Sequence, residues 1–452
     1  MANETKSKMT RTGGLTTRQS IMVGITLFSM FFGAGNLILP PLLGYQAGAA
    51  SVPATIGFLV TGIGLPVFGV MACALVGDLD KLAGRVHPRF AYAFAILIYL
   101  SIGPCLAIPR TSSTAFEMAL PILSAAAGGS ADAGLVSVAR VIFSIAFFAL
   151  ATMLALRPNK LTQLLGRVTG PLLLALIVVV VAAAIAVPLG VPAAASAPYD
   201  KAPAIQGFIT GYQTMDVLAS LTFGIVIAQN IRSLGVEENG PVAREVMKAG
   251  LLMGVLMALV YCGTAYVGTS LGPQPGEVAN GATVLTASAS GHFGFAGTVI
   301  IAAIFLLACL NVCIGLLSCC AAFFHERFER VPYRVWVVLF AVFSCVVSNA
   351  GLDAILAFSV PLLNALYPVA IVLVLMGMGH AVCDRAPMVW PWVGGVVSVV
   401  SVATSLRDVA APQTWLVLDA LPLADLGFNW VVPALLALAV GIVHSKLVGE
   451  RA

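Results

Sequence analysis

Charge is the scarcest property of this chain. Only 9% of its 452 residues are Asp, Glu, Lys or Arg, whereas 60% are hydrophobic. A soluble globular domain carries about 25% charged residues. Because so few charges cannot cover a water-exposed surface, the sequence predicts a polytopic membrane protein in contact with a lipid bilayer. The formal charge of +4 is small and does not suggest a nucleic-acid partner.

Several chemical signatures are also missing. The nine cysteines form no CxxC pair, and the five histidines form no HExxH motif. No P-loop is present, so the sequence does not indicate ATP as a direct energy source. We find no pair of acids on facing apolar segments. These absences argue against an intramembrane enzyme, and we expect no cofactor.

Long apolar runs dominate what is there. A hydrocarbon core about 30 Å thick is crossed by about 20 apolar residues in a helix. Breaking the chain at its polar segments gives twelve candidate spans: 19–46, 52–76, 90–109, 137–156, 166–188, 205–231, 246–270, 294–324, 334–349, 352–379, 389–406 and 428–447. The polar segment 1–18 precedes a run without a clear cleavage site, so we predict a cytoplasmic tail and an uncleaved first span.

The basic residues test this topology, because Lys and Arg accumulate in cytoplasmic loops. With the N-terminus in the cytoplasm, all but four of the 23 basic residues fall on the cytoplasmic side of the twelve spans. The four on the outer side are Arg110, Arg140, Lys201 and Arg407. We therefore predict twelve spans with both termini in the cytoplasm.

The first predicted span contains the stretch SMFFGAGNLILPP, residues 29–41, which is a poor helix for lipid. A broken helix frees backbone N–H and C=O groups, at several kcal/mol per unsatisfied group in hydrocarbon. Gly33 and Gly35 permit such a break and a close ligand approach. Free N–H groups near Ala34 would attract a carboxylate. The alternative is that small residues only allow tight helix packing.

The same break also offers oxygen atoms. Carbonyls near Ser29 and Phe32 would suit a small hard cation such as Na⁺, and Asn36 adds a side-chain oxygen. The break therefore predicts a site for both a carboxylate and a cation.

A second interruption lies in the sixth span, in GYQTMDVLASLTFG, residues 211–224. Its Asp216 is costly in a span and is typical of a functional site: it could bind a cation, carry a proton or meet a substrate amine. Alternatively, it lies near the outer mouth, where it is solvated or structural.

The two breaks are five helices apart, so the second set of five would be inverted. Inverted repeats with paired broken helices indicate a midplane site in a secondary transporter. A channel needs a continuous pore, which this pattern does not favour.

Three other polar residues stand out. Arg110 and Glu117 follow the third span and lie two helical turns apart, so we expect a structural ion pair at the outer boundary, with a gate as the alternative. Asn311 lies in the middle of the eighth span, where it could hydrogen-bond between helices or donate its oxygen to a cation.

Four segments carry a family resemblance: FFGAGNLILPPLLGYQAG, GPCLAIPRTSSTAFEM, GYQTMDVLASLTFGIVI and LACLNVCIGLL. With them the chain, from about residue 18 to 447, resembles the bacterial branched-chain amino acid:cation symporter family. This resemblance implies an all-α, leucine-transporter-type fold with 5+5 inverted repeats and discontinuous helices 1 and 6. The repeats would span 19–188 and 205–380, with peripheral helices 11 and 12 in 389–447, all in one transporter domain.

The resemblance also implies an activity: uptake of leucine, isoleucine and valine across the bacterial inner membrane with Na⁺, or in some members H⁺. A proton-coupled permease of broader neutral specificity, with Asp216 as proton carrier, is the alternative. The resemblance implies no obligate protein partner.

Site residues follow from the resemblance position by position. The first break would meet the substrate carboxylate, and SLTFG resembles the unwound part of helix 6. The implied substrate-binding residues are Gly33, Ala34, Gly35, Asn36, Asp216, Leu218, Ser220 and Phe223. The implied Na⁺ site consists of Ser29, Phe32, Ala308 and Asn311. Relatives usually have threonine at position 311, 312 or both, whereas this chain has Asn311 and Val312, and valine cannot bind a cation.

Overall fold

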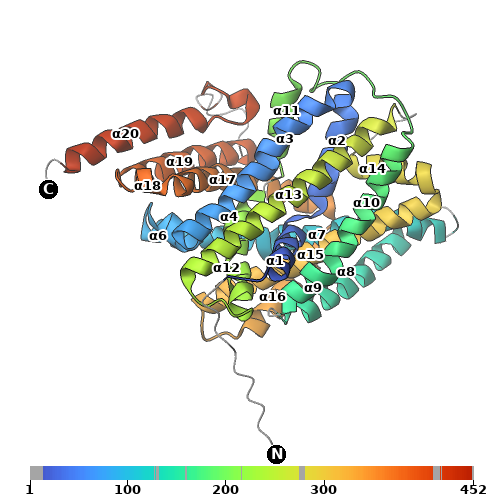
Figure 1. Cartoon of the computed structure of the whole chain (residues 1–452), viewed down its shortest axis with the longest axis horizontal. Helices are drawn as coiled ribbons and strands as arrows, with labels where there is room; N and C mark the ends of the chain where they lie inside the picture. The colour runs from blue at the N-terminus through green and yellow to red at the C-terminus, as the bar shows by residue number, and fades with distance from the viewer. Residues whose placement is uncertain are drawn as a thin grey trace, which may run out of the picture.

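The computed structural model describes residues 14–126, 128, 132–157, 160–214, 216–273, 280–410, 418 and 420–449. Within these residues all regular structure is helical, as the composition predicts (Figure 1). Every one of the twelve predicted apolar ranges falls on a helix or on consecutive helices.

The first five predicted spans correspond to helices that are mostly interrupted. In chain order they are α1 (Thr17–Phe31) with α2 (Ala34–Ala47), α3 (Ser51–Leu59) with α4 (Leu65–Val76), α6 (Pro88–Leu100) with α7 (Ala107–Ala126), α8 (Ala133–Ala155), and α9 (Leu161–Leu164) with α10 (Gly170–Ala186). Wide π-helical turns join the later pairs: η2 (Val60–Gly64), η3 (Ser101–Cys105) and η5 (Leu165–Thr169). The short helices η1 (Gly48–Ala50) and α5 (Leu79–Gly84) are connectors.

The remaining spans are longer and more regular. They are α11 (Pro203–Tyr212) with α12 (Asp216–Ser233), α13 (Asn239–Leu271), α15 (Phe295–Arg327), α16 (Tyr333–Ser348), α17 (Leu352–Met378), α19 (Val389–Ala410) and α20 (Val431–Gly449). Three short helices, α14 (Gly281–Phe293), α18 (His380–Cys383) and η7 (Ala424–Leu426), lie between them. The apolar pattern did not predict α14, which packs against α2, α13 and α15.

By length and composition, eight helical stretches among the described residues can cross a membrane, or nine with the bent pair α11 and α12. One of the eight, Ala34–Val76, holds the second part of the first predicted span and all of the second, and the chain turns between them at Gly48, where φ is +47°. Two shorter apolar helices, Tyr333–Ser348 and Val431–Leu447, add to these. The chain is therefore a multi-pass membrane protein.

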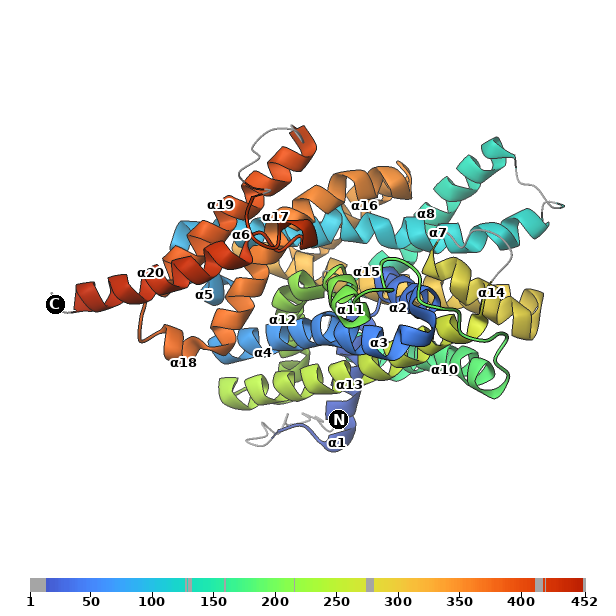
Figure 2. The same ribbon diagram turned by 90° about the horizontal axis from the view of Figure 1, so that it is seen from above.

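The helices pack as two groups. The first group contains α1, α2, α3, α4, α11, α12 and α13, and the second contains α7, α8, α15 and α16 (Figures 1 and 2). Outside both, α19 and α20 pack on each other at one side of the molecule, with α17 between them and α4.

Glycines hold the first group together. Gly44 of α2 lies against the Ala265 carbonyl of α13, and Gly268 of α13 lies against the Pro41 carbonyl of α2. A Cβ at either glycine would clash with backbone, so the two helices approach as closely as only glycine allows. Small residues therefore do serve helix packing at these positions.

Candidate functional site

The first helix is broken where the sequence predicts it. α1 ends at Phe31 and α2 begins at Ala34, with Phe32 and Gly33 in non-helical backbone between them. The first-turn N–H groups of α2 have no intrahelical carbonyl to bind. They carry the positive end of the α2 dipole, which favours an anion.

The sixth span is also broken, but earlier than expected. α11 ends at Tyr212, α12 begins at Asp216, and the two helices meet at 45°. Residues 220–224, which resemble the unwound part of helix 6, lie inside continuous helix α12. The prediction that SLTFG unwinds is therefore wrong. The chain unwinds in the preceding segment, next to the carboxylate.

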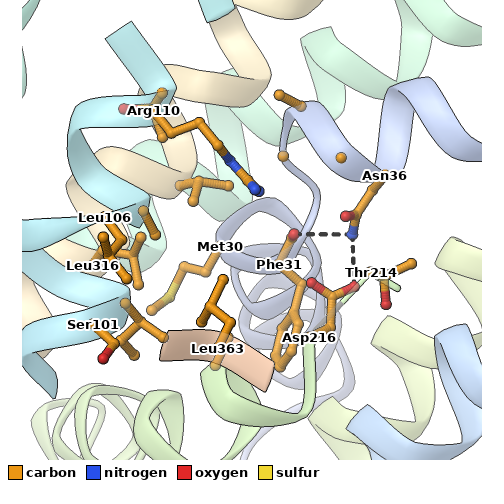
Figure 3. A pocket seen from close by; sticks show the side chains of 18 of the residues that line it. Met30, Phe31, Asn36, Ser101, Leu106, Arg110, Thr214, Asp216, Leu316 and Leu363 are labelled. Atoms are coloured by element: carbon orange, nitrogen blue, oxygen red, sulfur yellow. Dashed lines mark hydrogen bonds between the residues drawn. The ribbon is translucent and has the colours of Figure 1, made fainter. Parts of the chain in front are cut away.

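Asn36 links the two breaks. Its side-chain Nδ2 donates to the Phe31 carbonyl at 3.1 Å and to Asp216 Oδ2 at 2.9 Å (Figure 3). Both partners lie next to a break, one at the end of α1 and one at the start of α12. Asn36 and Asp216 are only 3% and 8% exposed, so Asp216 is buried in the protein rather than solvated at a mouth.

A cavity of about 100 Å³ lies at the two breaks. One water needs roughly 10–15 Å³ of such volume, so the cavity suits a small molecule. Its walls come from α1, α2 and α12 of the first helix group and from α7 and α15 of the second, with η3 beside α7 and Leu363 of α17 completing them. The cavity therefore lies at the boundary between the two groups.

The lining divides by polarity. Gly33, Ala34, Gly35, Asn36, Arg110, Thr111, Gln213, Thr214 and Asp216 gather near the breaks, and Ser101 adds a hydroxyl. The other lining residues are apolar: Met30, Phe31, Ile102, Leu106, Ala107, Ala219, Phe223, Val312, Leu316 and Leu363. Such a cavity can hold a molecule with a charged or polar end and a small hydrocarbon end.

Six of the eight predicted substrate-binding residues line this cavity: Gly33, Ala34, Gly35, Asn36, Asp216 and Phe223. Leu218 and Ser220 do not line it. Cavity residues of α12 recur as 216, 219 and 223, which is one face of a helix, so 218 and 220 point elsewhere. Ser220 instead packs against Gly69 of α4.

Arg110 is misplaced by the sequence prediction. The hydrophobic run ends at residue 109, but the helix continues as α7 to Ala126, and Arg110 lines the cavity instead of the outer boundary (Figure 3). Glu117 forms its ion pair with Arg140 of α8, at 3.5 Å. The expected Arg110–Glu117 pair is therefore absent from the described residues.

The predicted cation residues lie beside the cavity and do not line it. Ser29 donates to the Ile25 carbonyl at 2.8 Å, Phe32 stacks on Phe28, and Ala308 is fully buried. Asn311 is fully buried as well, and neither atom of its amide has a hydrogen-bond partner among the described residues. An unpaired buried amide is costly, so it calls for a ligand or a role.

Two helix groups, paired breaks and a cavity between them define a class of protein: a membrane transporter of the leucine-transporter fold. Two solved transporters share this fold. MhsT, solved with L-phenylalanine, aligns with a TM-score of 0.53 over 97% of this chain and 99% of MhsT at 14% identity. Mhp1, a nucleobase-cation-symport-1 family transporter, aligns with a TM-score of 0.60 over 98% of this chain and 97% of Mhp1 at 13% identity.

Sequence comparison then gives the family. Residues 16–448 match the family model described as branched-chain amino acid transport protein, so the chain belongs to this family. The branched-chain amino acid permease BraB of Bacillus subtilis is 35% identical, covering 96% of this chain and 97% of its own. The branched-chain amino acid transport system 2 carrier protein of Pseudomonas aeruginosa is 37% identical, covering 95% and 97%. The chain is thus an amino acid transporter of the branched-chain family rather than an enzyme.

Proposed function

We propose that this protein is a secondary active symporter that imports leucine, isoleucine and valine across the bacterial inner membrane, driven by Na⁺. The single observation that carries the proposal is the cavity at the two breaks, which has a polar end built from α2 and α12 and an apolar end lined by Met30, Leu316 and Leu363. The names of the relatives support the substrate class. The distribution of basic residues supports cytoplasmic termini.

The apolar end sets the expected specificity. A hydrophobic pocket separates side chains that differ by one methylene by only about 1–3 kcal/mol. We therefore expect leucine, isoleucine and valine to compete for one site. A charged amino acid would bury an unpaired charge among Met30, Phe223 and Leu363, so it should compete poorly.

For the coupling ion, we propose that Na⁺ binds between α1 and α15, near Ser29, Phe32, Ala308 and Asn311. The unpartnered buried amide of Asn311 supports this location, since its oxygen is a suitable ligand for a hard cation. Val312 contributes no oxygen, so Asn311 takes the role that a threonine has in relatives.

A proton-coupled permease of broader neutral specificity is the second candidate. It is favoured by Asp216, a carboxylate that lines the cavity and is held by the Asn36 amide instead of a basic side chain. Such a group can exchange a proton with the cavity.

One experiment separates these candidates. The purified protein is reconstituted in proteoliposomes, and leucine uptake is measured under a Na⁺ gradient alone and a H⁺ gradient alone. The symporter proposal expects saturable uptake that follows the Na⁺ gradient and that excess isoleucine or valine inhibits. Uptake that follows only the H⁺ gradient would support the second candidate, and gradient-independent, non-saturable flux would contradict both.

A further inference from the structure

Arg110 is a basic residue in the wall of the cavity. It projects from α7 into the cavity, and within the described part of the chain its guanidinium forms no ion pair shorter than 4 Å. Removing a guanidinium from water is costly unless an anion and hydrogen-bond acceptors replace the water. Asp216 lines the same cavity and attracts the guanidinium, but only from beyond ion-pair distance, so the position can still accept a further anion.

The guanidinium of Arg110 lies close to the start of α2. Arg110 Nη2 lies 3.7 Å from the point where a Cβ on Gly35 would stand. Since Gly35 has no side chain, the space between the guanidinium and the first turn of α2 is open to a ligand. An anion there would meet the guanidinium and the positive end of the α2 dipole together.

Asp216 does not fill this role. Its Oδ2 accepts from Asn36, and Figure 3 shows Asn36 and Asp216 facing each other while Arg110 reaches in from the opposite helix group. Glu117 is also excluded, because it pairs with Arg140. The cavity thus has a cationic side on α7 that is separate from its anionic side on α12.

We propose that Arg110 binds the α-carboxylate of the transported amino acid and thereby makes a free carboxylate a requirement for binding. This inference rests on the proposed function, because it names the residue that binds the carboxylate end of the same substrate. The planar guanidinium can donate two parallel hydrogen bonds to a carboxylate, which an amide or an ester cannot accept in the same way. The hydrocarbon end of the substrate then lies toward Met30, Leu316 and Leu363.

The test compares ligands as well as variants. Binding of leucine, leucinamide and 3-methylbutylamine to the purified full-length protein is measured by competition with radiolabelled leucine and by thermal stabilisation. We expect the wild type to bind leucine roughly 100-fold or more tightly than leucinamide, as for loss of one partner of a buried charge pair. Arg110→Gln should lose about that factor for leucine and keep its weak leucinamide binding, so that the discrimination disappears.

Two further variants keep the test interpretable. Arg140→Gln removes a basic residue of α8 that pairs with Glu117 outside the cavity lining, so it should leave the discrimination unchanged. If Arg110→Gln does not fold, Arg110→Lys is the alternative, because lysine keeps the charge but cannot donate two parallel hydrogen bonds. This variant should show an intermediate loss of affinity for leucine and no loss for leucinamide.

The outcomes separate this inference from the proposed function. Wild-type protein that binds leucine and leucinamide equally well would overturn the role of Arg110 and leave the substrate class intact. Equal weakening of both ligands in the Arg110 variants would also overturn it, since that is the result of a structural role. Wild-type protein that binds none of the three branched-chain amino acids would overturn both proposals.

Discussion

The two helix breaks differ in what they contribute to the cavity. The first, between α1 and α2, is built from glycine and backbone, and the only side chain it adds to the polar end is the neutral Asn36. The second, between α11 and α12, places the carboxylate Asp216 at the start of a helix. The cationic side chain comes from neither break but from α7 in the other helix group.

This difference indicates a division of labour. A break made of backbone can bind a group common to all amino acids, because N–H groups do not depend on the substrate side chain. A break that carries a titratable side chain can respond to a cation or a proton. Asn36 donates to a residue at each break, namely Phe31 and Asp216. A change of charge at Asp216 can therefore affect the first break through the single amide of Asn36.

The largest effect is expected at the first break. Gly35→Leu should abolish leucine uptake without loss of expression, because its side chain would occupy the space between α2 and Arg110. The measurement is uptake by proteoliposomes, with protein amount checked by size-exclusion chromatography.

Two controls accompany this variant. Gly35→Ala places its Cβ in ordinary contact with Arg110 and should retain part of the uptake, and Gly395→Leu enters open space on α19. Wild-type uptake by Gly35→Leu would rule out a substrate site at the first break.

At the second break we expect a change of coupling rather than of substrate binding. Asp216→Asn keeps the size of the side chain and removes its charge. The cation concentration or pH that gives half-maximal uptake should shift by about tenfold, equivalent to about 1.4 kcal/mol, while leucine affinity changes by less than about threefold. Uptake as a function of Na⁺, pH and leucine checks this. The opposite pattern would reassign Asp216 to the substrate amine.

Much of the fold could be predicted from the sequence, because each span needs a long apolar run and each break needs residues that a lipid-facing helix avoids. The ranges predicted for α13, α15 and α17 agree with the helices to within a few residues at most boundaries. The first break was predictable because glycine and proline mark it locally.

The directions in which side chains point were less predictable. Hydropathy ended the third span at residue 109, since the next residues are polar, but Thr111, Ser112, Ser113 and Thr114 are all buried against other helices. A buried helix can carry hydroxyls that bond to backbone, as Ser113 does to the Ser348 carbonyl. The face of α12 could have been found by starting the helix at Asp216, because residues three and seven positions later then share its side.

A smaller effect is expected from a substitution of Asn311, which tests the proposed Na⁺ site. Replacing an unpaired buried amide with an apolar group of similar size removes a penalty of about 1–3 kcal/mol, so Asn311→Leu should raise the melting temperature in Na⁺-free buffer. It should also abolish the further stabilisation by Na⁺ that we expect for the wild type. The measurement is thermal unfolding at increasing Na⁺ concentration at constant ionic strength.

The matched control is Ser401→Ala in α19, where the hydroxyl is also buried without a partner among the described residues. This variant should gain stability and keep the response to Na⁺. If Na⁺ stabilises Asn311→Leu as strongly as the wild type, Asn311 is not a cation ligand.

The smallest effect is expected where the two helix groups touch at their surface. Gln229 of α12 donates to Glu326 of α15 at 3.2 Å, across the boundary on which the cavity lies. An exposed hydrogen bond of this kind contributes about 0.5–1 kcal/mol, so Gln229→Ala should change the initial rate of leucine uptake by no more than about fivefold. Asn239→Ala removes a comparable exposed bond, from Arg232 at 3.1 Å, but inside the first group. If uptake requires the groups to move against each other, only Gln229→Ala should alter the rate; equal effects of the two variants would show that this boundary has no special part in transport.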